Sequence, residues 1–230
     1  MQVFQIRIKL YFLKDIPANQ IQTRLTALID KGFYLDEELS QTHEVNRYKN
    51  YSYDLPYPIE QDGQYKKGKI YTVTIRTIDS RMAEYFHEVC VNQFTGEIKA
   101  LTAEIRILPK KAIQTLYTLT PAVVKDEKGY WRTHMSLAEY EKRLKNNLIK
   151  KWNCFQKEKM REDFQLYTLL EFLNDKPIGI EYKNICLLGD KLRLQVSDNE
   201  AAQNLAYMSL GTGILEMNSR GCGFVNYRWL

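Results

Sequence analysis

Three histidines are the side chains best suited to proton transfer near neutral pH: His43, His87 and His134. His87 lies one position from the apolar stripe of a run with helical spacing, which favours a structural or surface role. His134 precedes Ser136, which with Glu139 has the spacing of a capping box, and a role at a helix end accounts for it. His43 lies in a polar stretch without periodicity, where loops carry function more often than packing. It is therefore the best candidate for a general acid or base.

The four cysteines do not form a recognisable metal or disulfide motif. Cys90, Cys154, Cys186 and Cys222 lie at least 32 residues apart, so no CxxC pair is present. A disulfide framework is not expected in a chain of this size. We expect four reduced, mostly buried thiols, no metal site and no cofactor.

A glycine-rich segment near the carboxyl end is the most specific motif in the sequence. Four glycines fall within 13 residues: Gly211, Gly213, Gly221 and Gly223. They allow positive φ and a close approach of the backbone, so exposed N–H groups could hold phosphates. A Rossmann or P-loop site does not fit, because those loops lead from a strand into a helix. The alternative is an ordinary long turn that joins a helix to a final strand.

Positive charge is concentrated in one segment. Residues 142–161 carry eight basic side chains and one acidic one, although the whole chain has a formal net charge of only +5. Such a segment on a helix could follow a phosphate backbone, and a solvated helix face is an equally good interpretation. The cations that we expect to bind an anionic polymer are Lys142, Arg143, Lys145, Lys150 and Lys151.

The composition is that of a folded globular protein. With 230 residues, 44% hydrophobic and 27% charged, the chain can form one large domain or two smaller ones with cores of their own. The apolar start of the chain is interrupted by Arg7 and Lys9, and no run approaches the length of a membrane span. We therefore expect a cytoplasmic protein that does not bind a membrane.

The first half alternates between periods of two and of 3.6 residues. This pattern predicts strands over 4–12, 51–55, 69–77 and 101–107, and helices over 21–32 and 82–94. In the last strand, one face carries Leu101, Ala103, Ile105 and Ile107, and the other carries Thr102, Glu104 and Arg106. Residues 1–110 thus have the order β-α-β-β-α-β of a ferredoxin-like unit, an antiparallel sheet with both helices on one face.

The second half, 115–230, predicts a similar order after a linker at 109–114. Strands are expected over 115–124, 191–196 and 224–229, and helices over 136–152 and 199–208. Phe164–Leu173 is ambiguous, because a tandem arrangement requires a strand there and local propensity suits a helix equally well. The prediction for the fold class is α+β, with two tandem ferredoxin-like units and a C-terminal glycine-rich loop.

The motif GTG, seven residues and GCGFV at the end of such a chain resembles the CRISPR repeat-processing endoribonucleases of the RAMP superfamily. Further blocks look similar: Leu119–Pro121, the helix end Asn147–Trp152, and His43–Val45 followed by Lys49 and Tyr51–Tyr53. Together these blocks cover nearly the whole chain. The resemblance implies RAMP/RRM-like units in which the first carries the catalytic histidine.

The resemblance also implies a reaction. In this family a histidine between the first helix and the second strand is often followed six residues later by a lysine, and His43 and Lys49 fit that spacing. His43 would take the 2′-hydroxyl proton or protonate the leaving 5′-oxygen, and Lys49 with Arg47 would stabilise the phosphorane. The products would be a 2′,3′-cyclic phosphate and a 5′-hydroxyl, formed without a metal ion.

The implied partner is CRISPR repeat RNA within precursor crRNA, with other CRISPR effector subunits and a second copy of the chain as further candidates. Arg220 and the four glycines would grip phosphates. Two features differ from the family pattern: the first helix has Leu28, Ile29 and Asp30 where relatives can have a tyrosine, and Arg220 is the only cation between the glycine pairs. The alternative function is therefore a non-catalytic RAMP-type subunit that holds repeat or guide RNA.

Overall fold

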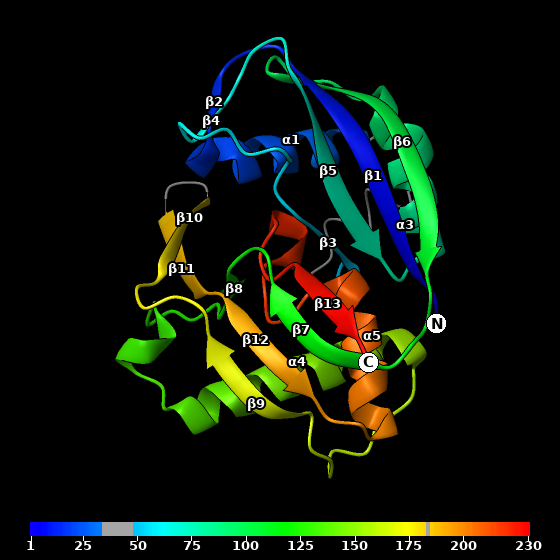
Figure 1. The fold of residues 1–230 in the computed structure, drawn as a ribbon, viewed down its shortest axis with the longest axis vertical. Coiled ribbons are helices and arrows are strands. Elements are labelled where there is room, and N and C mark those ends of the chain that lie inside the picture. The colour runs from blue at the N-terminus through cyan, green and yellow to red at the C-terminus, as the bar shows by residue number, and fades with distance from the viewer. Residues whose placement is uncertain (34–47, 183–184) are drawn as a thin grey trace.

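The computed structural model describes residues 1–33, 48–182 and 185–230. It contains two four-stranded antiparallel sheets, one from each half of the chain, with helices packed behind both of them in the view of Figure 1. The first sheet has the strand order β3-β5-β1-β6, and the second has the order β13-β7-β12-β9. In each half the first and third strands of the unit are central, as in a ferredoxin-like fold. The α+β class and the tandem arrangement are confirmed.

The first unit follows the predicted order closely. Its central strand β1 alternates between the helix layer and the open face, and Ile6, Ile8 and Leu10 are buried beneath the helices. Asp79 is the N-cap residue of α3 (Ser80–Glu84), and its carboxylate accepts hydrogen bonds from the backbone N–H groups of Arg81 and Met82 in the first turn. The elements are β1 (Val3–Phe12), β2 (Ile16–Pro17), α1 (Ile21–Phe33), β3 (Tyr51–Tyr53), β4 (Gln64–Tyr65), β5 (Ile70–Thr77), α3 (Ser80–Glu84) with helical turns continuing to Asn92, and β6 (Ile98–Leu108).

The second unit repeats this order with a longer first helix. The predicted capping box is present: Ser136 Oγ accepts from the Glu139 N–H, and the Glu139 carboxylate accepts from the Ser136 N–H. The ambiguous segment forms strand β9, which pairs with β12 in the register Phe172↔Leu192, so the tandem arrangement outweighs helix propensity there. The elements are β7 (Ile113–Thr118), β8 (Ala122–Val123), α4 (Leu137–Gln156), β9 (Tyr167–Phe172), β12 (Leu192–Val196), α5 (Glu200–Thr212) and β13 (Val225–Trp229).

One hairpin was not expected from the sequence. Strands β10 (Ile178–Tyr182) and β11 (Ile185–Asp190) pair with each other, and β11 also pairs with β8 to form a separate three-stranded sheet. The hairpin extends toward α1 of the first unit (Figure 1), where Asn19 Nδ2 donates to Glu181 Oε1 over 2.7 Å. Burial alternates in the short strand β10, but in β11 it runs from exposed residues at the start to buried ones at the end, so no sustained period of two marks this hairpin.

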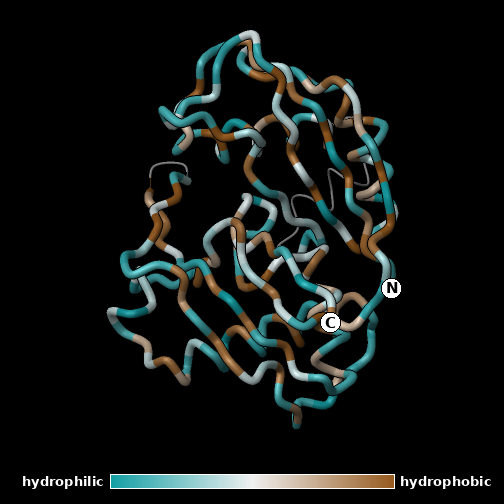
Figure 2. Tube along the Cα trace, in the orientation of Figure 1, coloured by the Kyte–Doolittle hydropathy of each residue, from teal (hydrophilic) through white to brown (hydrophobic). Residues whose placement is uncertain are grey.

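Hydrophobic residues recur along the strands and helices of both units (Figure 2), and the buried ones form one large cluster for each unit. The expectation of mostly buried thiols is half wrong. Cys90 and Cys222 are buried, whereas Cys154 and Cys186 are exposed because they lie near the end of α4 and on the outer hairpin. Within the described part of the chain, none of the helices is both long and apolar enough to span a bilayer.

The predicted alternation in β6 is interrupted. Ala100 pairs with Leu10 and Thr102 with Lys9, so Leu101 is the extra residue of a bulge. After the bulge, Ile105 pairs with Ile6 and Ile107 with Phe4, which places both isoleucines on the helix side. They are nevertheless 42% and 50% exposed, because β6 is an edge strand.

Arg76 joins the two units. It lies on the open face of β5 and is only 5% exposed, because the second unit covers it. Its guanidinium donates to Gln5 Oε1 over 2.9 Å and to the Val225 carbonyl over 2.7 Å, and it stacks 4.7 Å from the ring centroid of Phe224. Burial lowers the pKa of Arg76 to about 10, so the group stays charged at neutral pH. A buried cation of this kind fixes β13 against the first sheet.

Replacing Arg76 with Met should therefore lower the free energy of unfolding by about 2 kcal/mol or more, because the Val225 carbonyl and Gln5 lose their donor. The free energy of unfolding of Arg76→Lys should lie between those of the native protein and Arg76→Met, since lysine keeps the charge but not the planar guanidinium. Arg7→Met, an exposed position on the same sheet face, is the control and should change little. Urea denaturation measures all three, and equal effects at positions 76 and 7 would contradict this role.

Candidate functional site

The glycine-rich segment has two structural parts. Gly211 lies inside α5, not in a loop, and a Cβ there would come within 2.7 Å of Ile78 Cγ2. Its role is close packing of α5 against the first unit. The other three glycines have φ of +70° at position 213, +80° at 221 and +63° at 223, so they form a true loop (residues 213–223, the glycine loop).

The N–H groups of the loop glycines are already in use. Gly213 donates to the Ser209 carbonyl, Gly221 to Asn218 and Gly223 to Pro121, each over 2.8 to 3.0 Å. A Cβ on Gly221 would come within 2.7 Å of Tyr53 Cε2, and one on Gly223 within 2.2 Å of the Ile214 carbonyl oxygen. In this structure these glycines therefore permit tight packing of the loop, and their N–H groups do not form a phosphate cradle.

Lys151 of α4 holds the glycine loop through hydrogen bonds from its amino group. It is 2% exposed, and Nζ lies 2.9 Å from the Gly213 carbonyl, 2.9 Å from the Leu215 carbonyl and 2.8 Å from Asn218 Oδ1. Asn218 continues the support, since its Nδ2 donates to the carbonyls of Ile214 and Cys222. Burial lowers the pKa of Lys151 to about 7, with Glu216 acting in the opposite direction. The expectation that Lys151 lies on a phosphate-binding surface does not agree with this position.

The other four cations that we expected to bind an anionic polymer separate into two groups. Arg143 is paired with Asp126 and Glu216, and Lys145 Nζ donates to the carbonyls of Glu162 and Phe164. Lys142 and Lys150 lie exposed on the same side of α4 and line a hollow of about 370 Å³ with Tyr48, Asn146 and Glu216. Only part of the predicted charge is thus presented to solvent.

A larger cleft brings Lys49 to the glycine loop. It has a volume of about 600 Å³ and adjoins the hollow with Lys142 and Lys150, since both share Tyr48, Asn147 and Glu216. Desolvation raises the pKa of Tyr48, with Glu216 and Cys154 adding to the effect, so its hydroxyl stays protonated. The residues lining the cleft are Tyr48, Lys49, Asn50, Tyr51, Lys125, Asn147, Lys151, Cys154, Thr212, Leu215, Glu216, Met217, Asn218 and Ser219.

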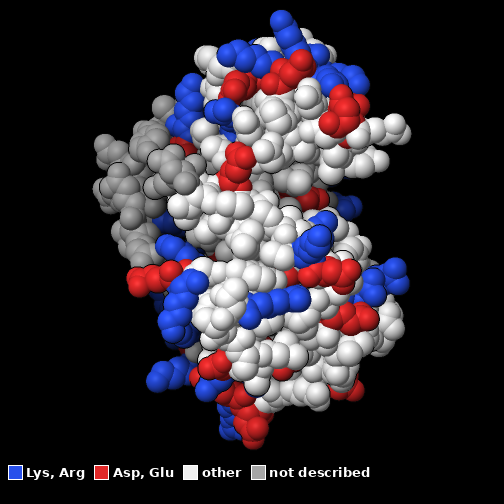
Figure 3. All heavy atoms as spheres, turned by 90° about the vertical axis from the view of Figure 1, so that its left-hand side faces the viewer, with Lys and Arg blue, Asp and Glu red and all other residues white. Residues whose placement is uncertain are grey.

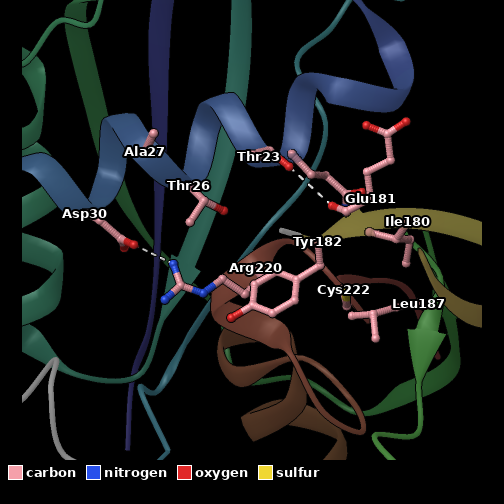
Figure 4. A pocket seen from close by; sticks show the side chains of 11 residues that line it. Thr23, Thr26, Ala27, Asp30, Ile180, Glu181, Tyr182, Leu187, Arg220 and Cys222 are labelled. Atoms are coloured by element: carbon pink, nitrogen blue, oxygen red, sulfur yellow. Dashed lines mark hydrogen bonds and ion pairs between the residues drawn. The ribbon is translucent and has the colours of Figure 1, made fainter. Parts of the chain in front are cut away.

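A second cavity, of about 300 Å³, lies between α1 and the β10–β11 hairpin (Figure 4). At one end Arg220 of the glycine loop forms an ion pair with Asp30 of α1, and the Tyr182 ring lies beside it. Ile180 and Leu187 form an apolar wall at the other end. Arg220 is therefore held by a carboxylate, and hydrogen bonding to Asp30 raises its pKa against the opposing effect of burial.

His43 and Arg47 lie outside the described residues, and Lys49 is the described member of that group. His134 lies 3.5 Å from Asp126 beside the start of α4, which agrees with a helix-end role, and His87 is half-buried on the α3 segment. Among the described residues, no group of three or more His, Cys, Asp or Glu could hold a metal ion. Figure 3 shows acidic and basic side chains interspersed on the side of the molecule where α1 and β10 lie.

Sequence reasoning missed the support that Asn218 gives the glycine loop, and the inward direction of Lys151. A signal for Lys151 was present, because it follows Leu144 by seven residues and Leu148 by three, which is the buried stripe of α4. Asn218 carried no comparable signal. Its function depends on loop conformation, with Met217 beside it at a φ of +61°.

Lys151 also makes stability depend on pH. The unfolded chain keeps the ordinary, higher lysine pKa, so above about pH 7 the unfolded state binds more protons than the folded one. The free energy of unfolding of the native protein, relative to Lys151→Met, should therefore rise with pH between about 7 and 9, by up to about 1.4 kcal/mol per pH unit. Thermal unfolding over this range measures the difference. Lys150→Met, the exposed neighbour, should show no such trend, and a flat difference for Lys151→Met would contradict the assignment.

The comparison with known proteins gives a consistent result. The family model "CRISPR associated protein Cas6, C-terminal" matches residues 107–227. The fold is similar to a structure described as "CRISPR associated protein Cas6", with a TM-score of 0.74 and 22% identity, covering 98% of this chain and 99% of that one. No match was found among curated proteins.

Two further structures are similar over almost the whole length. One, described as "An RAMP protein binding different RNA substrates", has a TM-score of 0.73 and 19% identity over 98% of this chain and 99% of that one. The other, described as "Characterization of a Cas6-related gene from Pyrococcus furiosus", has a TM-score of 0.69 and 17% identity over 98% of both chains. The structural matches agree with the tandem ferredoxin-like fold, and the family model covers more than half of the sequence, including α4, α5 and the glycine loop. The chain belongs to the CRISPR-associated Cas6 family.

Proposed function

We propose that this protein is an endoribonuclease that binds CRISPR repeat RNA and cleaves precursor crRNA once within each repeat. The observation that carries the proposal is the cleft in which Lys49 meets the glycine loop. It lies where the segment after α1, which contains His43, rejoins the described chain at residue 48. Membership of the Cas6 family supports the same substrate and reaction.

The chemistry uses the 2′-hydroxyl of the RNA as the nucleophile. His43 takes the 2′-hydroxyl proton or protonates the leaving 5′-oxygen, and the 2′-oxygen forms its bond to phosphorus as the bond to the 5′-oxygen breaks. Lys49 and Arg47 stabilise the negative charge that develops on the phosphorane oxygens. The products are a 2′,3′-cyclic phosphate and a 5′-hydroxyl. The nucleophile belongs to the substrate, so no bound metal ion is needed to activate water.

The exposed lysines of α4 supply a path for the RNA backbone. Lys142 and Lys150 line the hollow that continues the cleft, with Tyr48 between the two spaces. Among residues 1–33, 48–182 and 185–230 neither lysine has an ion-pair partner, so both can contact phosphates without leaving one there. Arg143 and Lys145, in contrast, would have to leave partners on the protein. The similar structure that binds different RNA substrates supports this use of the fold.

A second candidate function is RNA binding without cleavage. Asp30 occupies the part of α1 where relatives with this His and Lys pattern can have a tyrosine, and it is paired with Arg220. This pair takes the only cation of the glycine loop away from a phosphate. A similar fold also occurs in a partial Cas6-RT-Cas1–Cas2 complex, with a TM-score of 0.59, which supports a role within a larger assembly.

Cleavage of the repeat RNA from the protein's own locus tests the proposal. We expect one cut per repeat, in the presence of excess chelator, and no cut in RNA with a 2′-deoxy residue at the scissile position. His43→Ala should lower the single-turnover rate by roughly two to four orders of magnitude, and Lys49→Ala should also lower it. His87→Ala is the matched control and should cleave normally.

Other outcomes separate the alternatives. Tight, repeat-selective binding without cleavage by the native protein would favour the RNA-holding subunit. Normal cleavage by His43→Ala would show that another group transfers the proton, and inhibition by chelator would contradict metal independence.

Salt dependence tests the proposed RNA path. For single-stranded RNA, the logarithm of the binding constant should fall with the logarithm of salt concentration, and each lysine removed from a phosphate contact should reduce this slope by about 0.7. Lys142→Gln and Lys150→Gln should each reduce it, whereas Lys14→Gln, between β1 and β2 at the far end of the first unit, should not. An unchanged slope for both α4 variants would place the RNA elsewhere.

A further inference from the structure

Strand β6 leaves much of its outer edge unpaired. It is an 11-residue edge strand whose inner neighbour is β1. At its start the outer edge is used, since the Ala100 N–H donates to the Gln93 carbonyl and Phe94 bridges to Lys99. Between Thr102 and Leu108, none of the described strands pairs with this edge. An edge of this length is a template for another strand.

Apolar side chains accompany this free edge. Ile105 and Ile107 are 42% and 50% exposed, although they lie on the helix side of the sheet with Ala103. The helical turns between β5 and β6 pack against β6, and Ile98 and Ala100 at its start are buried whereas Ile105 and Ile107 are not. Edge strands that stay single usually carry an inward charge or a proline at such positions. This edge has neither between Thr102 and Leu108.

The charges on the other face of β6 are self-complementary. Glu104 and Arg106 flank Ile105, and both point to the open side of the sheet. We propose that β6 pairs with β6 of a second copy of this chain, antiparallel, about a two-fold axis at Ile105. In this register Glu104 lies opposite the partner's Arg106, Ile105 opposite its own copy, and Ile107 opposite the partner's Ala103.

The neighbouring registers are unfavourable. In a symmetric dimer that continues the sheet, two residues that lie opposite each other point to the same face. The two-fold axis must therefore lie between one residue and its own copy in the partner, and not between two consecutive residues. An axis at Glu104 brings two glutamates together, and an axis at Arg106 brings two arginines together. An axis at Ile105 replaces both repulsions with two attractions and also pairs the isoleucines.

The resulting dimer has one continuous eight-stranded sheet with both helix layers on the same side. Each Glu104 then lies between Arg7 of its own β1 and the partner's Arg106. The cleft with Lys49 lies between the units and α4, so it stays open in both copies. The inference concerns assembly only and does not depend on the proposed cleavage.

The molar mass in solution without RNA is the first test. Sedimentation analysis should show a reversible dimer, and Ile105→Lys should weaken it at least about tenfold, because two buried ammonium groups would face each other. A native protein that stays monomeric, or a dimer unaffected by Ile105→Lys, would overturn the proposal. Circular dichroism and RNA cleavage by this variant check that it is folded.

Charge reversal tests the register. Glu104→Arg alone and Arg106→Glu alone should each weaken the dimer, since each creates two like-charged pairs across the axis. The double variant E104R/R106E should restore it, because the pairs return with reversed sign. A double variant as weak as the single variants would contradict the register.

Crosslinking locates the axis directly. In a Cys154→Ser, Cys186→Ser background, Ile105→Cys should oxidise to a covalent dimer, because residues facing each other across antiparallel strands have Cα atoms about 4.5 to 5.5 Å apart. Ile107→Cys is the matched control. Its own copy would lie about 13 Å away along the strands, beyond disulfide reach. Equal crosslinking at positions 105 and 107 would overturn the two-fold axis at Ile105.

Discussion

The burial of the Lys151 amino group is the constraint on which the candidate site depends. Three oxygen acceptors of the glycine loop converge on Nζ at 2.8 to 2.9 Å, and the Lys151 side chain is only 2% exposed. An ammonium group can donate to all three acceptors, whereas a neutral amine can donate to only two. The loop conformation and the charge state of this lysine are therefore linked. Tight packing at Gly213 and Gly223 leaves little room for the loop to adapt if this support is lost.

The glycine loop in turn connects the two units. Gln22 of α1 donates to the Gly221 carbonyl over 2.7 Å, and Arg220 pairs with Asp30 of the same helix. Elsewhere between the two units, the Arg76 guanidinium donates to the Val225 carbonyl of β13, the strand that follows the loop. The support therefore runs from α4 through Lys151 to the loop and on to the first unit. These contacts together determine where Lys49 lies relative to α4. None of the residues that make them has a role in the proposed reaction.

The sequence predicted the parts of this arrangement that follow from periodicity. The alternation around Ile6 and Ile8 and the capping box at Ser136 correspond to local geometry, and both are present. The β10–β11 hairpin and the exposure of Ile105 could not be predicted in this way. They depend on which strand lies at the edge of a sheet and on where a separate small sheet packs, and neither is encoded within a few neighbouring residues.

The site residues show the same limit at the level of chemistry. Residue type identified Lys151 as a cation, but its position on the buried stripe of α4 determines that it binds loop carbonyls. Lys150, one residue earlier, is exposed to solvent, because successive residues of a helix are rotated by about 100° and this rotation takes it off the buried stripe. A basic segment on a packed helix therefore divides into charges that support the fold and charges that are available to a ligand. In this chain that division leaves Lys142 and Lys150 beside the cleft, so the RNA path follows from helix geometry more than from the total charge of the segment.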